Sequence, residues 1–268
     1  MASVLLKRRG AETVNLKSAR VLISNDDGIA APGLKVLERA VKPLVKEVWV
    51  VAPETEQSAT SHSLTLRRPL RLRKISARRF AVDGTPTDSV LLGVSEVMKG
   101  KRPDLVLSGV NQGGNIGEDV TYSGTVAAAM EGTLLGIPSV ALSQVYQNDR
   151  LVHWATAEAW IGPVLKMMAK SDWPADILMN VNFPAVNANA VTGIEAVRQG
   201  RRKIGGDLTP GRDPRGKTYY WIGPQRDEDR GRKGTDLEAV LRGAIAVTPL
   251  SMDLTHKTML KKLKASLA

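Results

Sequence analysis

The chain has 268 residues with a formal net charge of +11, and its length suits one large α/β domain or two smaller ones. It has no cysteine and only three histidines, which excludes disulfides, thiolate metal sites and a cysteine nucleophile and makes zinc a poor fit. No apolar run approaches the roughly 20 residues of a membrane span, and no apolar core of a secretory signal follows Met1, so we expect a cytoplasmic protein without a membrane partner.

Strand and helix signals alternate after a mixed, basic stretch at residues 1–18, which we interpret as a flexible extension. The predicted strands are short apolar runs, and the predicted helices carry apolar residues at helical spacing. The predicted elements are a strand at Val21–Ser24, a helix from Pro32 to about Val41, strands at Glu47–Ala52, Leu64–Leu72 and Phe80–Val82, a helix starting in Gly84–Asp88, a strand at Leu105–Leu107, a helix at Tyr122–Leu135, a strand at Ile137–Leu142, a helix at Val152–Met168 and a strand at Ile177–Val181. This alternation favours a doubly wound, parallel α/β sheet with right-handed crossovers.

The composition changes after about Val186. Gly, Arg, Pro and Asp crowd Arg198–Lys233, which also contains the aromatic patch Tyr219–Trp221. Because the aromatic patch argues against a disordered loop, we interpret this region as an extended hairpin or arm packed on a partner subunit. A strand at Ala244–Val247 and a basic terminal helix complete the predicted fold.

The first strand ends abruptly in the polar run Asn25–Gly28, which contains Asp26 and Asp27. Adjacent carboxylates repel each other, and a hard cation such as Mg²⁺ or Mn²⁺ gives a reason to place them together. Open α/β sheets also bind ligands at the carboxyl ends of their strands. A plain polar turn is the alternative, since these residue types form good turns. This tetrapeptide by itself leaves both interpretations open.

Three further polar segments follow predicted strands and would meet at the same sheet edge: the loop around Ser58, the loop Ser108–Asn115, and Tyr122–Thr125 at a helix start. Hydroxyls, amides and free backbone N–H groups beside carboxylates suit a divalent cation next to a phosphate. The glycines of the second loop match neither the dinucleotide fingerprint nor a P-loop, which disfavours a nicotinamide enzyme or an ATPase. His62 could be a general acid or a loop histidine with a local hydrogen bond, and we favour the second.

The chain resembles the SurE family of survival-protein nucleotidases, from about Ala19 to His256. The matching segments are VLISNDDGI, VVAPETEQSATSHSLTL, VDGTPTDSV, the long run from Pro103 to Ser143, and DLEAV with AVTPLSMDLT. The resemblance implies a Rossmann-like α/β core as a single domain at 19–268. Within it, residues 187–268 would form an extended arm, other C-terminal elements and a terminal helix, used to assemble a homodimer or homotetramer.

The resemblance also implies a function. It implies hydrolysis of nucleoside 5′-monophosphates, and of 3′-monophosphates, to nucleoside and phosphate, with one divalent ion per subunit, Mg²⁺ or Mn²⁺. The implied metal ligands are Asp26, Asp27, Ser58 and Asn111, the two aspartates being the catalytic residues, and the implied phosphate-binding residues are Asn115, Ser123, Gly124 and Thr125. We expect water to attack phosphorus with an aspartate assisting, rather than an aspartate attacking.

Three alternatives remain. The first is a phosphatase for other phosphoesters, such as sugar phosphates or polyphosphate. The second, a receiver-like Mg²⁺ switch, is disfavoured because the strand Leu105–Leu107 ends in Ser108 and Gly109 instead of an acceptor aspartate. The third is a basic nucleic-acid-binding module; an aromatic content of 4% is poor for stacking unpaired bases, so we do not expect a nucleic-acid partner.

Overall fold

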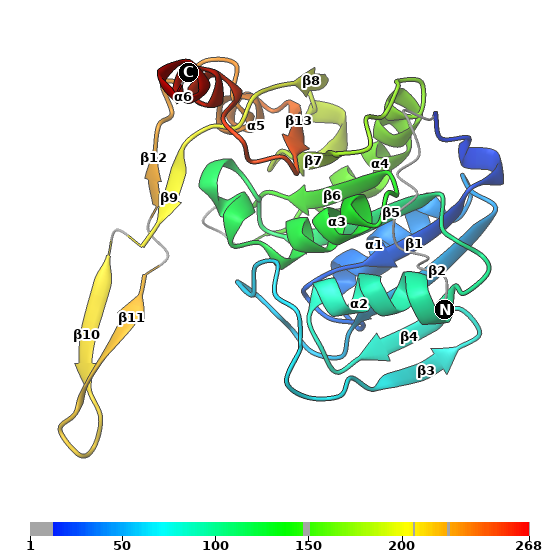
Figure 1. Cartoon of the computed structure of the whole chain (residues 1–268), viewed down its shortest axis with the longest axis horizontal. Coiled ribbons are helices and arrows are strands. Elements are labelled where there is room, and N and C mark those ends of the chain that lie inside the picture. Colours follow the sequence, from blue (N-terminus) through cyan, green and yellow to red (C-terminus); the bar gives the residue numbers. More distant parts are fainter. Residues whose placement is uncertain (1–12, 147–150, 206, 224–225, 268) are drawn as a thin grey trace.

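The computed structural model describes residues 13–146, 151–205, 207–223 and 226–267. A nine-stranded sheet forms its centre, in the order β3-β4-β2-β1-β5-β6-β7-β13-β8, and a long arm projects from it (Figure 1). The strands are β1 Arg20–Ser24, β2 Glu47–Pro53, β3 Leu72–Ser76, β4 Arg79–Val82, β5 Leu105–Gln112, β6 Ser139–Gln144, β7 Ile177–Phe183, β8 Ile194–Ala196, β9 Arg202–Ile204, β10 Leu208–Arg212, β11 Thr218–Ile222, β12 Arg226–Glu228 and β13 Ile245–Ser251. The helices are α1 Pro32–Val41, α2 Pro86–Leu92, α3 Gly124–Leu134, α4 Trp154–Met168, α5 Asp236–Leu241 and α6 Lys257–Leu267, with short helical turns η1 Leu16–Ser18, η2 Gly93–Val97, η3 Gly117–Thr121 and η4 Ala188–Ala190.

The sheet is mostly parallel, as the alternation of elements predicts. β4, β2, β1, β5, β6 and β7 run parallel, whereas β3 and β13 pair antiparallel with β4 and β7. Helices α1 and α4 cover one face, and α2 and α3 cover the other. None of the described helices is long and apolar enough to cross a membrane.

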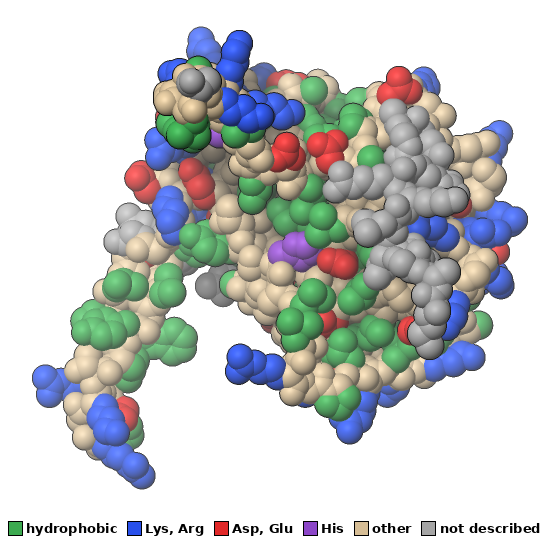
Figure 2. Space-filling view, in the orientation of Figure 1, with side chains coloured by type: hydrophobic (Ala, Val, Ile, Leu, Met, Phe, Trp, Pro, Cys, Tyr) green, Lys and Arg blue, Asp and Glu red, His purple; other side chains and the backbone are tan. Residues whose placement is uncertain are grey.

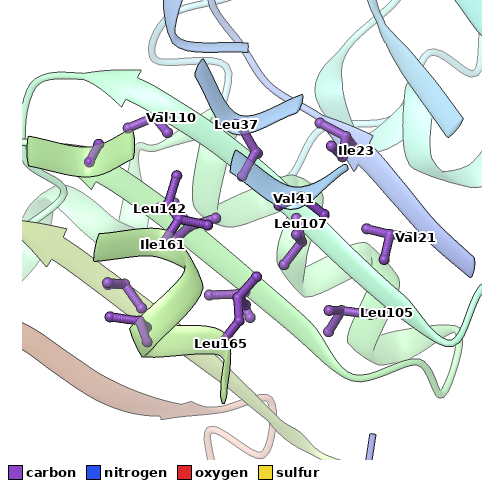
Figure 3. Close-up of a cluster of buried hydrophobic side chains, with 14 of the residues drawn as sticks. Val21, Ile23, Leu37, Val41, Leu105, Leu107, Val110, Leu142, Ile161 and Leu165 are labelled. Carbon is purple, nitrogen blue, oxygen red and sulfur yellow. The ribbon is translucent and has the colours of Figure 1, made fainter. Parts of the chain in front are cut away.

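Both faces of β1 are buried, which explains its continuous apolar sequence. Val21 and Ile23 point to the face covered by α1 and α4 and belong to the same buried cluster as Leu37 and Ile161 (Figure 3). Leu22 points to the opposite face, in the core under α2 and α3. This burial holds the end of β1, and the polar run that follows it, in a fixed position.

The structure confirms the predicted start of α2 at Thr85 and Pro86. The Thr85 hydroxyl accepts from the Asp88 N–H at 3.1 Å, and the Asp88 carboxylate accepts from the Thr85 N–H at 2.9 Å, which together form a capping box. Pro86 occupies the first turn, where its missing N–H costs nothing.

The predicted strand at Leu64–Leu72 is wrong, because strand structure begins only at Leu72. The backbone N–H and the hydroxyl of Thr65 both donate to Asp88, at 3.0 and 2.6 Å, which ties the segment to α2 instead of the sheet. Pro69 adds a further obstacle, since it has no N–H to give to a neighbouring strand.

Strand β5 is longer than predicted and runs on to Gln112. Its register with β6 shifts between Ser108 and Asn111, so this part contains a bulge. The glycine in the bulge makes the sequence look like a loop, although Val110 is fully buried. Asn111 therefore lies at the end of a strand next to β1.

The region Arg198–Lys233 forms the predicted extended hairpin. β9 pairs with β12 and β10 with β11, both antiparallel, and the ladder extends away from the sheet (Figure 1). Hydrophobic side chains lie exposed along it (Figure 2). Trp221 and Tyr220 are 69% and 65% exposed. Elsewhere in the predicted range 187–268, β8 and β13 join the main sheet. Of the predicted extension, residues 1–12 lie outside the described residues, and Val14 packs into the core.

Candidate active site

The carboxyl ends of β1, β2 and β5 and the start of α3 surround a cleft of about 1270 Å³. Six of the predicted site residues line it: Asp26, Asp27, Ser58, Asn111, Asn115 and Ser123. Gly124 and Thr125 adjoin it through their contacts with Asp26. The topology thus brings together segments that lie about 100 residues apart in the chain.

A turn at Gly28 directs the two aspartates into this cleft. Gly28 has a φ of +95°, and a Cβ there would stand 3.2 Å from the backbone of Thr55. Only glycine suits both the conformation and the close approach. The Asn25 amide donates to the Gly28 carbonyl at 3.0 Å, and the Gln57 N–H donates to the Asp26 carbonyl at 2.8 Å. The end of β1 is therefore joined to the loop after β2.

The carboxyl groups of Asp26 and Asp27 are adjacent and largely buried, so burial and mutual repulsion disfavour their charged forms. Burial raises the pKa of Asp26. The hydroxyl of Thr125 donates to its carboxylate and offsets part of this rise. Burial and the neighbouring charge of Asp26 raise the pKa of Asp27 to about 6. None of the described lysines or arginines forms an ion pair with either group. The arrangement consequently favours a bound cation.

The loop carrying Ser58 is held by strained backbone and by the turn before α3. Ala59 and Ser61 have φ values of 58° and 54°, which non-glycine residues adopt only when their surroundings enforce it. Ser61 supplies that constraint: its N–H donates to the Tyr122 carbonyl at 3.1 Å, and its hydroxyl donates to the Thr121 carbonyl at 2.9 Å.

The hydroxyl of Ser58 donates to Glu56 at 2.7 Å, and Glu56 itself lines the cleft. Sequence reasoning missed this third carboxylate, although its place two residues before Ser58 in the same loop is the signal that could have found it. Its charge also contributes to the raised pKa of Asp26 and Asp27.

The two asparagines of the third segment have different surroundings. The Asn111 amide nitrogen donates to the Gly113 carbonyl at 2.8 Å, which leaves its oxygen for a ligand. Asn115 is buried, and its amide nitrogen donates to Ser143 at 2.8 Å.

Two asparagines of β7 anchor the Asn115 backbone. The Asn182 side chain accepts from the Asn115 N–H at 2.9 Å, and the amides of Asn180 and Asn182 donate to the Asn115 carbonyl. Sequence reasoning missed both, and the signal was two amides at alternate positions of an otherwise apolar strand. This network fixes the loop that follows β5.

Helix α3 directs its N-terminus at the aspartates. Ser123 caps it by accepting from the Val126 N–H at 3.1 Å, and the backbone N–H of Thr125 interacts with the Asp26 carboxylate, so the N–H of Gly124 is the one left without an acceptor in the helix. A Cβ on Gly124 would stand 2.8 Å from the Cβ of Asp26, so glycine is what allows this approach. Free N–H groups at a helix start bind anions such as phosphate.

His62 contacts a distant part of the chain, whereas the sequence favoured a hydrogen bond within its own loop. Its Nε2 lies 3.0 Å from a carboxylate oxygen of Glu131, a nearly buried residue of α3. His62 is not among the residues that line the cleft. The contact connects the Ser58 loop to the helix that starts at the candidate phosphate site.

The donor set fits a hard divalent cation. Asp26, Asp27, the hydroxyl of Ser58 and the amide oxygen of Asn111 offer only oxygen ligands, which Mg²⁺ and Mn²⁺ prefer. Within the described ranges, no group of three or more His, Cys, Asp or Glu side chains could hold a metal. The candidate is therefore the mixed carboxylate, amide and hydroxyl set.

The arm supplies one wall of the cleft, which sequence reasoning missed. Arg202 of β9 pairs with Asp119 at 3.3 Å and Glu228 at 3.0 Å, and Arg226 of β12 pairs with Asp119 at 3.2 Å. Asp236 accepts N–H bonds from both sides of this junction, from Gly117 and Gly200. These partners lie too far apart in the chain for spacing to reveal them.

Comparisons with known proteins identify the family of the chain. Residues 21–206 match the family described as "Survival protein SurE". A protein of Paramagnetospirillum magneticum named 5′-nucleotidase SurE is 64% identical over 249 residues, covering 93% of this chain and 96% of its own length. One of the same name from Rhodospirillum rubrum is 54% identical over 244 residues, covering 90% and 93%. The crystal structure of the SurE protein from Aquifex aeolicus has a TM-score of 0.81 and 41% identity, covering 93% of this chain and 100% of that one. As its motifs predict, the chain belongs to the SurE family.

Proposed function

We propose that this protein is a 5′-nucleotidase, which hydrolyses nucleoside 5′-monophosphates to nucleoside and phosphate with one bound divalent ion, Mg²⁺ or Mn²⁺. One observation carries the proposal: Asp26 and Asp27 are adjacent, Asp26 lies against the start of α3, and within the described residues neither carboxylate forms an ion pair with a lysine or arginine. A cation site next to an anion site is what hydrolysis of a phosphate ester requires. The names of the relatives described above support the same activity.

The chain's own residues would position the reacting groups. Asp26 is oriented by the hydroxyl of Thr125, and Asp27 accepts from the Gln112 N–H at 3.3 Å. With Ser58 and Asn111 they would hold the cation, which when bound offsets charge on a phosphate oxygen in the transition state. The N–H groups of α3 would bind the remaining phosphate oxygens.

Water attack is the reaction that we favour. A water molecule attacks phosphorus, and one of the two carboxylates orients it and accepts its proton. Asp27 is the better placed, because it is partly exposed to the cleft whereas Asp26 is buried. The bond from phosphorus to the nucleoside oxygen breaks, and solvent in the open cleft protonates that oxygen.

We also propose that the arm packs on a second copy of the chain, in a homodimer or homotetramer. The support is the exposure of Tyr219, Tyr220, Trp221 and Ile222 on β11, since a folded arm gains little by presenting these side chains to water. Light scattering on wild type and a Trp221→Ser variant tests this proposal. A monomeric wild type would contradict it. Hydrolysis of 3′-monophosphates and a cytoplasmic location stay predictions.

The test of the function is phosphate release from 5′- and 3′-nucleotides, sugar phosphates and polyphosphate, each with Mg²⁺, Mn²⁺ or EDTA. We expect release from 5′-monophosphates that requires a metal. Faster release from sugar phosphates or polyphosphate would instead favour a phosphatase for other phosphoesters. No release from any substrate would refute the proposal.

A further inference from the structure

Three aromatic side chains line the cleft, and one has a free ring. Trp154 packs against α1 and the core, with its ring 3.0 Å from where a Cβ on Gly33 would stand. The Tyr122 ring lies under Lys203, whose ammonium is 4.9 Å from the ring centroid and donates to the Tyr122 hydroxyl at 2.9 Å. Tyr146 is 39% exposed and makes neither a hydrogen bond nor a ring contact with the part of the chain that the structure describes. It is therefore the ring open to a ligand.

Tyr146 lies beside the candidate metal site. It follows β6, and the Gly113 N–H donates to the carbonyl of Gln144 at the end of that strand, at 3.0 Å. The Tyr146 ring edge and the Asn111 amide nitrogen lie 3.5 and 3.8 Å from where a Cβ on Gly113 would stand. Gly113 has a φ of +119°, which favours glycine, so no side chain separates the ring from the amide.

The size of the cleft leaves room for more than a phosphate and a cation. Sites for ligands of nucleotide size occupy roughly 300–1,000 Å³, and this cleft has about 1270 Å³. Its carboxylates and helix start suit the phosphate end of a nucleotide, whereas the free aromatic ring suits the opposite, flat and apolar end.

We propose that Tyr146 binds the nucleobase of the substrate by stacking, while the phosphate lies at the start of α3. This inference rests on the proposed function and adds to it a residue that determines substrate class. Stacking on an aromatic ring accepts every base, because each base has a π-face. The site accordingly accepts nucleotides of any base and discriminates against phosphate esters that have none.

The test compares AMP with ribose 5-phosphate, which has the same phosphate and sugar but no base. In the Tyr146→Ala protein we expect kcat/KM for AMP to fall about 10- to 100-fold, mainly through KM, with no change for ribose 5-phosphate. The Tyr146→Phe protein keeps the ring and should retain wild-type values. Equal losses on both substrates would show that the ring only supports the Asn111 loop, and an unchanged KM for AMP would show that the base binds elsewhere. Either result overturns the inference.

Binding of adenosine, measured by equilibrium dialysis, separates this inference from the proposed function. We expect wild type and Tyr146→Phe to bind adenosine at least ten-fold more tightly than Tyr146→Ala. Such binding by a wild-type protein that releases no phosphate from AMP would refute the nucleotidase and retain the base site. Normal AMP hydrolysis together with equal adenosine binding by all three proteins would retain the nucleotidase and refute the base site.

Discussion

Replacing Asp27 with asparagine should stabilise the metal-free protein while abolishing its activity. In the folded chain, burial and the charge of Asp26 hold the pKa of Asp27 near 6, against 3.8 for an ordinary aspartate. Between pH 3.8 and 6 the folded state therefore binds more protons than the unfolded state, so the free energy of unfolding falls as pH rises through that window. Asparagine keeps the shape and the acceptor for the Gln112 N–H but carries no charge.

The magnitude follows from the same pKa. One pKa unit corresponds to 1.36 kcal/mol, so ionising Asp27 in the folded protein costs about 3 kcal/mol at pH 7. In EDTA, the Asp27→Asn protein should be more stable than wild type by up to about 3 kcal/mol above pH 6, and the two should converge below pH 4. A bound cation removes the cost, so Mg²⁺ or Mn²⁺ should stabilise wild type and not the variant.

Urea denaturation followed by circular dichroism, from about pH 3.5 to 7.5, measures this difference and its loss at low pH. The Asp172→Asn protein is the matched control, because Asp172 is exposed and lies at the far end of α4 from the cleft. A variant at Asp27 that is no more stable than wild type at pH 7 in EDTA would refute the electrostatic account of the site.

The packing around α3 and α1 gives three further expected outcomes. Thr125→Val removes the hydroxyl that donates to Asp26 and should lower kcat about 10-fold or more, with the fold intact by circular dichroism; unchanged kcat would contradict that role. Gly124→Ala puts a Cβ 2.8 Å from the Cβ of Asp26. It should strongly reduce phosphate release while the melting temperature changes little. Gly33→Ala puts a Cβ 1.9 Å from a β5 carbonyl and should destabilise the fold by about 1–3 kcal/mol or more in urea, whereas Gly162→Ala, with ordinary contacts in α4, should be neutral or stabilising.

The sequence predicts the elements whose signals are local. The apolar run of β1 and its abrupt polar end draw attention to Asp26 and Asp27, although the tetrapeptide alone also fits a polar turn. Thr85 and Asp88 mark the start of α2, since a capping box involves residues only three positions apart. These features need no knowledge of distant parts of the chain.

The sequence does not predict contacts between distant segments. The strand expected at Leu64–Leu72 fails because Thr65 is held by Asp88, and that contact exists only in the folded chain. The wall formed by Arg202 and Arg226 with Asp119 joins residues separated by more than 80 positions. Charge clusters in the sequence show that such pairs can form, but not which of them do.

Phosphate release from AMP during titration of Mn²⁺ into EDTA-treated protein tests the central claim most directly. Wild type and the Asp172→Asn control should show the same saturable rise from no activity, and the Asp27→Asn protein should show none at any metal concentration. Turnover by wild type without metal, or full turnover by the Asp27→Asn protein, would contradict the assignment of the paired aspartates as the catalytic metal site.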